Sequence, residues 1–157
     1  MYQVEGHYTI TELSIITGLT FAHLHNNIDI PYTLDHNHPN TNKPVKIIST
    51  YDFENFLETK KTWDFDSTEY NKYLTVKRPI CRHFLHSTEV VEFFKLVDDY
   101  PISLSNVHYS LIRNKKIPAY QIDRKYLIPI HSVVEFSNAS NDDQLSKVIL
   151  SIIEKKN

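Results

Sequence analysis

The stretch from Ser103 to Val133 decides the fold, and it reads SLSNVHYSLIRNKKIPAYQIDRKYLIPIHSV. Its first part has the spacing of a short amphipathic helix over 104–114, with Ser103 as the N-cap. Two extended β-branched segments follow, and Asp123-Arg124 between them predicts a turn. The stretch therefore predicts a helix, a two-stranded hairpin and the start of another helix.

The same stretch concentrates positive charge in a chain whose formal net charge is -2. It holds five of the 17 Lys and Arg residues, namely Arg113, Lys115, Lys116, Arg124 and Lys125. Residues 1–70 carry ten acidic side chains against four lysines, whereas residues 71–130 carry ten cations against five acids. Clustered cations beside a short helix are typical of nucleic-acid binding, and the plainer interpretation is a solvated surface.

Length and composition narrow the possible classes of protein. The 157 residues are 41% hydrophobic and 23% charged, which is typical of one globular domain or two small ones. Two glycines are too few for a glycine-rich phosphate loop, and no hydrolase or metalloprotease motif is present, so we expect no catalysis and no cofactor. The single Cys81 excludes an intramolecular disulfide. No apolar run is long enough for a membrane span, so we expect a cytoplasmic protein.

Two halves of the chain share one order of elements. Each has a helix beginning near a Thr-Glu pair, a turn, a second short helix, an extended Ile-Pro segment, another strand and a helix. Thr11-Glu12 matches Thr88-Glu89, and Ile30-Pro31 matches Ile117-Pro118. Two copies of one supersecondary unit explain this order better than coincidence does.

The resulting fold prediction is α+β: mainly helical, with two small hairpins and a C-terminal helix. We expect an acidic unit over 1–61, a linker over 62–86, with a helix around 67–74, a basic unit over 87–139 and an amphipathic helix over 140–157. A helix, a turn, a second helix and a β-hairpin, in this order, define a winged helix-turn-helix. The prediction is thus of tandem winged helix-turn-helix-like units.

Residues 87–136 resemble the excisionase and MerR-like helix-turn-helix family. The resemblance lies in Thr88-Glu89-Val90-Val91 and in the run from Ser105 to Tyr120, where the family reads Ser-x-x-Thr-Val-Tyr-x-Leu-Ile-x-x-Gly-x-Leu-Pro-Ala. Lys115 or Lys116 replaces the usual glycine, and the turn between the two helices is long. Residues 8–61 resemble the same family more weakly.

The resemblance implies that the second helix lies in the DNA major groove and that the hairpin follows the phosphate backbone. Ser105, Asn106, His108 and Tyr109 would then face base edges or nearby phosphates. The five cations of the opening stretch would neutralise phosphates. Periodicity predicts that Val107, Leu111 and Ile112 form the buried face of this helix. The second helix of the acidic unit, over 20–27, has no Lys or Arg, so we expect that unit to serve in folding or protein contact.

Histidine and cysteine residues suggest a metal site only weakly. Cys81, His83 and His86 lie close in the sequence, as do His36 and His38, but neither spacing is common for structural zinc. We therefore expect no metal. In the C-terminal helix, one stripe is formed by Leu145, Val148, Ile149, Ile152 and Ile153. This stripe either packs on its own unit or pairs with another subunit.

Taken together, these patterns predict a non-catalytic DNA-binding protein of a phage, plasmid or other mobile element, acting as a transcriptional regulator or in an excisionase-like role. Duplex DNA is the favoured partner, and single-stranded DNA remains open. The alternative is an accessory subunit that binds a replication enzyme such as a polymerase, primase or helicase. In that case the acidic unit or the C-terminal helix would contact the protein partner or a second copy. Tyr109, Tyr120 and Tyr126 would then stack on unpaired bases, or else pack within the fold.

Overall fold

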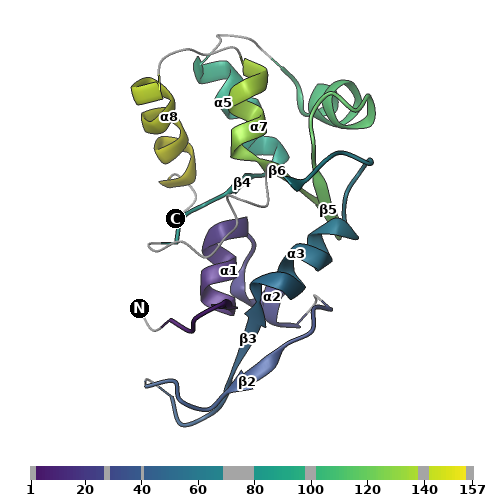
Figure 1. The fold of residues 1–157 in the computed structure, drawn as a ribbon. Coiled ribbons are helices and arrows are strands. Elements are labelled where there is room, and N and C mark those ends of the chain that lie inside the picture. The colour runs from purple at the N-terminus through teal and green to yellow at the C-terminus, as the bar shows by residue number, and fades with distance from the viewer. Residues whose placement is uncertain are drawn as a thin grey trace. The chain divides into compact units, whose positions relative to one another are not determined.

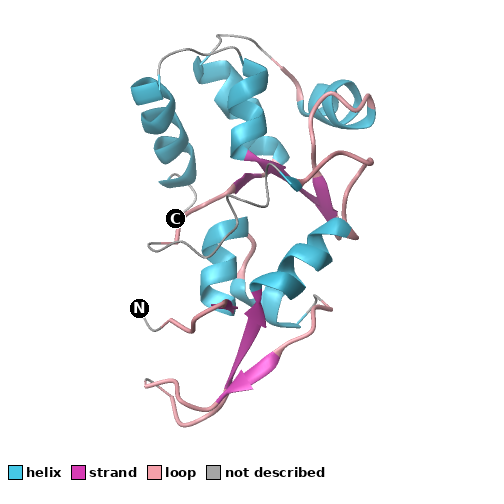
Figure 2. Ribbon diagram, in the orientation of Figure 1, coloured by secondary structure: helices cyan, strands magenta, loops and turns pink. Residues whose placement is uncertain are grey.

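The computed structural model describes residues 3–26, 29–39, 41–68, 80–97, 102–137 and 142–154 of the chain. The fold is α+β, as predicted, with helices and two small three-stranded sheets (Figures 1 and 2). The chain divides into two compact units. Unit 1 comprises residues 1–60 and 66–83, and unit 2 comprises residues 61–65 and 84–157.

Unit 1 has the predicted order of elements, preceded by one strand that was not predicted. Strand β1 (His7–Thr9) leads into helix α1 (Ile10–Thr17), and helix α2 (Phe21–Asn26) follows after a short turn. The hairpin strands are β2 (Thr33–Asp35) and β3 (Val45–Ser49), and helix α3 (Thr50–Glu58) completes the described elements of the unit.

Unit 2 repeats this order and adds a helix. Strand β4 (Phe84–Leu85) leads into helix α5 (Ser87–Val97). The second helix begins as α6 (Leu104–Asn106) and continues as the π-helix η1 (Val107–Arg113). The hairpin consists of β5 (Tyr120–Ile122) and β6 (Lys125–Pro129), and the helices α7 (Ile130–Ser137) and α8 (Asp142–Glu154) follow.

The two sheets have the same topology, which confirms the internal repeat at the level of strand pairing. Their strand orders are β1-β3-β2 and β4-β6-β5, and all described pairs are antiparallel. Tyr8 lies opposite Ile48 in one sheet, and Leu85 lies opposite Ile128 in the other. The turn is two residues long in unit 2, whereas nine residues separate β2 and β3 in unit 1.

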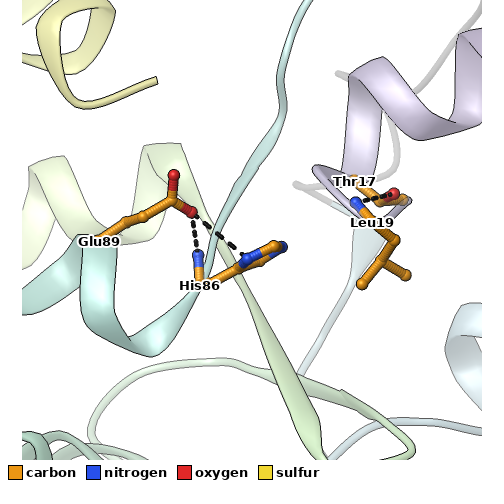
Figure 3. A network of polar contacts seen from close by, with 4 residues as sticks. All are labelled: Thr17, Leu19, His86 and Glu89. Carbon is orange, nitrogen blue, oxygen red and sulfur yellow. Dashed lines mark hydrogen bonds and ion pairs between the residues drawn. The ribbon is translucent and has the colours of Figure 1, made fainter. Parts of the chain in front are cut away.

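The first helix of each unit begins in a similar way. In unit 1 the Thr9 hydroxyl accepts from the Glu12 N–H (3.2 Å) and the Glu12 carboxylate accepts from the Thr9 N–H (3.0 Å), which is a capping box. In unit 2 the Glu89 carboxylate accepts from the His86 N–H at 2.8 Å (Figure 3). Both glutamates are fully buried, so the Thr-Glu signal in the sequence marks two equivalent helix starts.

The second helix of unit 2 departs from regular α-helical geometry. Ser103 is its N-cap, as predicted, and its hydroxyl accepts from the Asn106 N–H at 3.1 Å. The π-helix η1 follows, and π-helical turns are uncommon in proteins and frequent at functional sites. The helix ends where Lys115 adopts a left-handed φ of 59°. Lys115 is therefore the residue that takes the conformation for which glycine is usually chosen.

The C-terminal helix α8 packs on its own unit. Leu145 and Ile152 are buried in a core that also contains Phe93, Phe94 and Val133, and Val148 and Ile149 pack against this core. Figure 1 shows α8 beside α5. Leu145 and Ile152 are therefore not available as surface contacts to a partner.

The expected linker over 62–86 is divided between the units. Residues 61–65 belong to unit 2, where the N–H and hydroxyl of Thr62 donate to the Ala119 carbonyl (3.0 and 2.9 Å) and the Trp63 indole donates to the Ile117 carbonyl (3.0 Å). Residues 80–83 belong to unit 1, where the His83 N–H donates to the Ile16 carbonyl at 2.9 Å. The helix expected around 67–74 lies largely outside the described residues.

Candidate nucleic-acid interface

The predicted nucleic-acid-binding residues of unit 2 form an almost wholly exposed set. Ser105, Asn106, Tyr109, Arg113, Lys115, Lys116, Arg124 and Lys125 are exposed, and His108 is partly buried. The predicted buried face is confirmed, because Val107, Leu111 and Ile112 are at most 4% exposed. The second helix therefore presents its polar side chains to solvent and its apolar side chains to the core.

An aromatic and a cationic side chain pair on the exposed face of η1. Tyr109 is 56% exposed, and the Arg113 guanidinium lies 4.9 Å from the centre of its ring. This cation–π contact holds both side chains at the surface of the helix. A planar guanidinium and a phenol in this arrangement can contact a phosphate and a base or sugar at the same time.

A pocket of about 270 Å³ lies in unit 2, and we call it the basic pocket. The start of α5 contributes His86, Ser87 and Thr88, and the second helix contributes Leu104 and His108. The hairpin contributes Arg124, Lys125 and Tyr126. Three of the predicted residues, His108, Arg124 and Lys125, are thus brought together around one cavity.

Contacts among the lining residues hold the basic pocket in shape. The Nε2 atom of His108 lies 3.0 Å from the Ser87 hydroxyl oxygen, which joins η1 to the start of α5. The rings of His108 and Tyr126 lie 4.9 Å apart, which joins η1 to the hairpin. The N-terminal half of the second helix and the hairpin turn both line this pocket. The C-terminal end of the helix does not, so three of the predicted residues lie away from the pocket: Arg113, Lys115 and Lys116.

Unit 1 has a pocket of about 440 Å³ in the equivalent place, and we call it the apolar pocket. The start of α1 contributes Thr9, Ile10 and Thr11, and α2 contributes Phe21 and His25. The hairpin contributes Leu34, His38, Pro44, Val45 and Lys46. Phe21 and Leu34 are 51% and 49% exposed, so this pocket opens beside apolar surface.

The pairing registers make the two pockets comparable residue by residue. Phe21 and Leu104 each follow the N-cap of the second helix, and His25 and His108 lie four residues further on. Val45 and Lys125 are the first residues of equivalent strands. Unit 1 therefore has Val45 where unit 2 has Lys125, and Thr9 where unit 2 has His86.

Sequence reasoning did not identify several lining residues. Ser87, Thr88 and Leu104 were not predicted as part of a site, and His86 was considered only as a metal ligand. The internal repeat was the available signal, because it aligns Leu104 with the exposed Phe21. Among the described residues, no group of three or more His, Cys, Asp or Glu side chains is placed to hold a metal ion.

Comparison with protein-family models, with curated proteins and with solved structures found no match. In the described part of the chain, no helix has both the length and the apolar character needed to cross a bilayer.

Proposed function

We propose that the chain is a non-catalytic DNA-binding protein whose units are winged helix-turn-helix modules, and that unit 2 makes the DNA contact. The observation that carries this proposal is the convergence of His108 from the second helix with Arg124 and Lys125 from the hairpin around the basic pocket. In a winged helix, the second helix and the hairpin are the elements that approach the duplex. Their cations would neutralise phosphates and position the helix.

Within this proposal the exposed residues of the second helix have separate roles. Ser105, Asn106 and Tyr109 have no part in the core, so they are free to contact base edges or sugars. Arg113, Lys115 and Lys116 at the helix end would contact the backbone on the far side of the groove. Such a protein would act as a transcriptional regulator or in an excisionase-like role in a phage, plasmid or other mobile element.

The test is fluorescence anisotropy of the full chain on duplex and single-stranded oligonucleotides across a salt series. The variant Arg113→Ala/Lys116→Ala/Arg124→Ala removes three predicted contacts. The control Lys43→Ala/Lys95→Ala/Lys147→Ala removes three exposed lysines elsewhere, so both variants have the same net charge. We expect tight duplex binding at low salt, a log–log salt slope that falls by about 0.9 per lost phosphate contact in the first variant, and little change in the control. Absence of duplex binding at low salt would contradict the proposal.

The apolar pocket supports a second candidate function, an accessory subunit of a replication enzyme. Phe21 and Leu34 line this pocket and are exposed, and Tyr32 is an exposed aromatic residue that lies beneath the lining residue Lys46. Aromatic and aliphatic side chains of this kind are typical anchors in protein interfaces. This candidate predicts single-strand binding equal to or tighter than duplex binding, and a protein partner that is lost in Phe21→Ser/Leu34→Ser while DNA binding is retained.

A further inference from the structure

We propose that the basic pocket is a binding site for one tetrahedral oxyanion, which the phosphate backbone supplies when the protein is on DNA. The inference rests on the proposed function for one point, that the phosphate comes from DNA. The ability of the pocket to bind an oxyanion does not depend on that function. Its volume of about 270 Å³ is small for an organic ligand and suits a single phosphate group with ordered water.

The charges around the basic pocket favour an anion. Arg124 and Lys125 extend from the hairpin turn, and no lining residue carries a carboxylate. The closest described acid on α5 is Glu89, which is fully buried and whose carboxylate accepts from the His86 N–H and lies 3.7 Å from the His86 ring nitrogen. This carboxylate is therefore the partner of His86, which lines the pocket, whereas Asp123, which precedes Arg124 in the hairpin turn, is not a lining residue.

The same pocket supplies hydrogen-bond donors at the start of a helix. Ser87 and Thr88 bring hydroxyl groups, and Tyr126 brings a phenol. The 11-residue helix α5 begins at this wall with its N-terminus, where the helix dipole is positive. Cations, hydroxyl donors and a helix start thus border one cavity from three elements of the fold.

The apolar pocket serves as an internal comparison. It has the same position in an equivalent unit, but Val45 replaces Lys125 and Ile10 replaces Ser87. Its one lysine, Lys46, already donates to the His25 carbonyl at 3.1 Å and lies over the ring of Tyr32. The basic lining is therefore particular to unit 2 and does not follow from the fold alone, and we expect no oxyanion binding in unit 1.

Two imidazoles also line the basic pocket. The Nδ1 atom of His86 lies 3.7 Å from the Glu89 carboxylate, and the Nε2 atom of His108 lies 3.0 Å from the Ser87 hydroxyl oxygen. An imidazole N–H is a hydrogen-bond donor, so both rings belong to the polar wall of the pocket together with the hydroxyl groups.

The direct test uses sulfate as the probe, because sulfate is a tetrahedral oxyanion whose charge is constant near neutral pH. Two-dimensional amide NMR spectra of the full chain follow a sulfate titration at constant ionic strength. We expect saturable shifts at Ser87, Thr88, His108 and the hairpin turn, which are the residues that line the basic pocket. Shifts that are spread evenly over the basic surface, or that also appear around the apolar pocket, would overturn the proposal.

Matched variants separate the pocket from general charge. Arg124→Gln/Lys125→Gln removes two exposed cations at the turn, and Lys95→Gln/Lys147→Gln removes two exposed cations elsewhere in unit 2. We expect sulfate affinity to fall about tenfold in the first pair and to remain unchanged in the second. Equal losses of sulfate affinity in both double variants would show that positive charge attracts sulfate non-specifically, and would contradict the proposed site. For each variant, an amide spectrum with native dispersion establishes that the fold is retained.

The outcome with DNA distinguishes the two proposals. If sulfate binds as described and duplex DNA does not bind at low salt, the pocket stands and the DNA-binding function fails. If duplex DNA binds but sulfate produces no saturable shifts, the function stands and the oxyanion site fails. Both proposals are supported when Arg124→Gln/Lys125→Gln lowers the log–log salt slope for duplex binding and weakens sulfate binding together.

Discussion

The Nε2 atom of His108 lies 3.0 Å from the hydroxyl oxygen of Ser87, so the helix with the exposed polar residues is tied to the start of α5. Ser87 is 8% exposed, and the rings of His108 and Tyr126 lie 4.9 Å apart. One histidine thereby connects three elements that border the basic pocket. The pocket has a defined shape because these contacts are internal to unit 2.

The contact between His108 and Ser87 should contribute measurably to stability. Ser87→Ala removes the hydroxyl and leaves the imidazole, and we expect a loss of about 1 kcal/mol in the free energy of unfolding. Ser105→Ala is the control, because Ser105 is exposed, and its effect should stay within about 0.5 kcal/mol. Urea denaturation of both variants measures the difference, and equal midpoints would show that the contact is energetically neutral.

The left-handed conformation of Lys115 predicts a stabilising glycine substitution. Lys115 has a φ of 59°, whereas Lys116 has no positive φ. Left-handed backbone costs a residue with a Cβ about 1–2 kcal/mol, so Lys115→Gly should raise the free energy of unfolding by up to about 1 kcal/mol. Lys116→Gly should not stabilise the protein. Both variants remove one exposed cation, so the difference between their thermal unfolding midpoints reports backbone strain and not charge. A greater increase in stability for Lys116→Gly than for Lys115→Gly would contradict the assignment of the strain to Lys115.

Sequence patterns predicted the helices and hairpins well where side-chain periodicity and caps were strong. Ser103 is the N-cap of the second helix of unit 2, as expected, and the Thr-Glu pairs lie at the starts of α1 and α5. The short strands β1 and β4 were missed. Each is only two or three residues long and pairs with a strand some forty residues away, so no local pattern records it.

The site was less predictable than the fold. The sequence identified the cations and the exposed residues of the second helix, but it did not indicate which of them meet in space. His108 lines the same pocket as Arg124 and Lys125, while Arg113 pairs with Tyr109 instead. Nor could periodicity predict the π-helix η1, which changes the angular positions of the residues that follow it.

A tight backbone position in unit 1 predicts a steric effect of substitution. Gly18 ends α1 with a φ of 73°, and a Cβ at this position would collide with the Arg82 guanidinium. Gly6 has a similar φ of 71° but has open space around it. Gly6→Ala should therefore cost only the left-handed strain of about 1 kcal/mol, whereas Gly18→Ala should cost more.

A double variant isolates the part of this cost that comes from Arg82. In an Arg82→Ala background the Gly18→Ala penalty should fall to that of Gly6→Ala, because the collision is removed while the backbone strain remains. The native chain, the two single variants and the double variant are unfolded in urea, and their midpoints give the coupling free energy between positions 18 and 82. A coupling of zero would mean that Arg82 moves aside without cost.

The position of α8 predicts that the C-terminal helix stabilises unit 2 from within. Leu145 and Ile152 are 4% and 0% exposed, whereas Leu150 on the same helix is 56% exposed. Leu145→Ala and Ile152→Ala should each lower the free energy of unfolding by about 2–4 kcal/mol, because burial is lost and a cavity remains. Leu150→Ala should change it by less than about 0.5 kcal/mol. Denaturation of the native chain at two protein concentrations completes the test. A helix that paired subunits would make the denaturation midpoint depend on protein concentration, whereas a helix packed on its own unit would leave the midpoint unchanged.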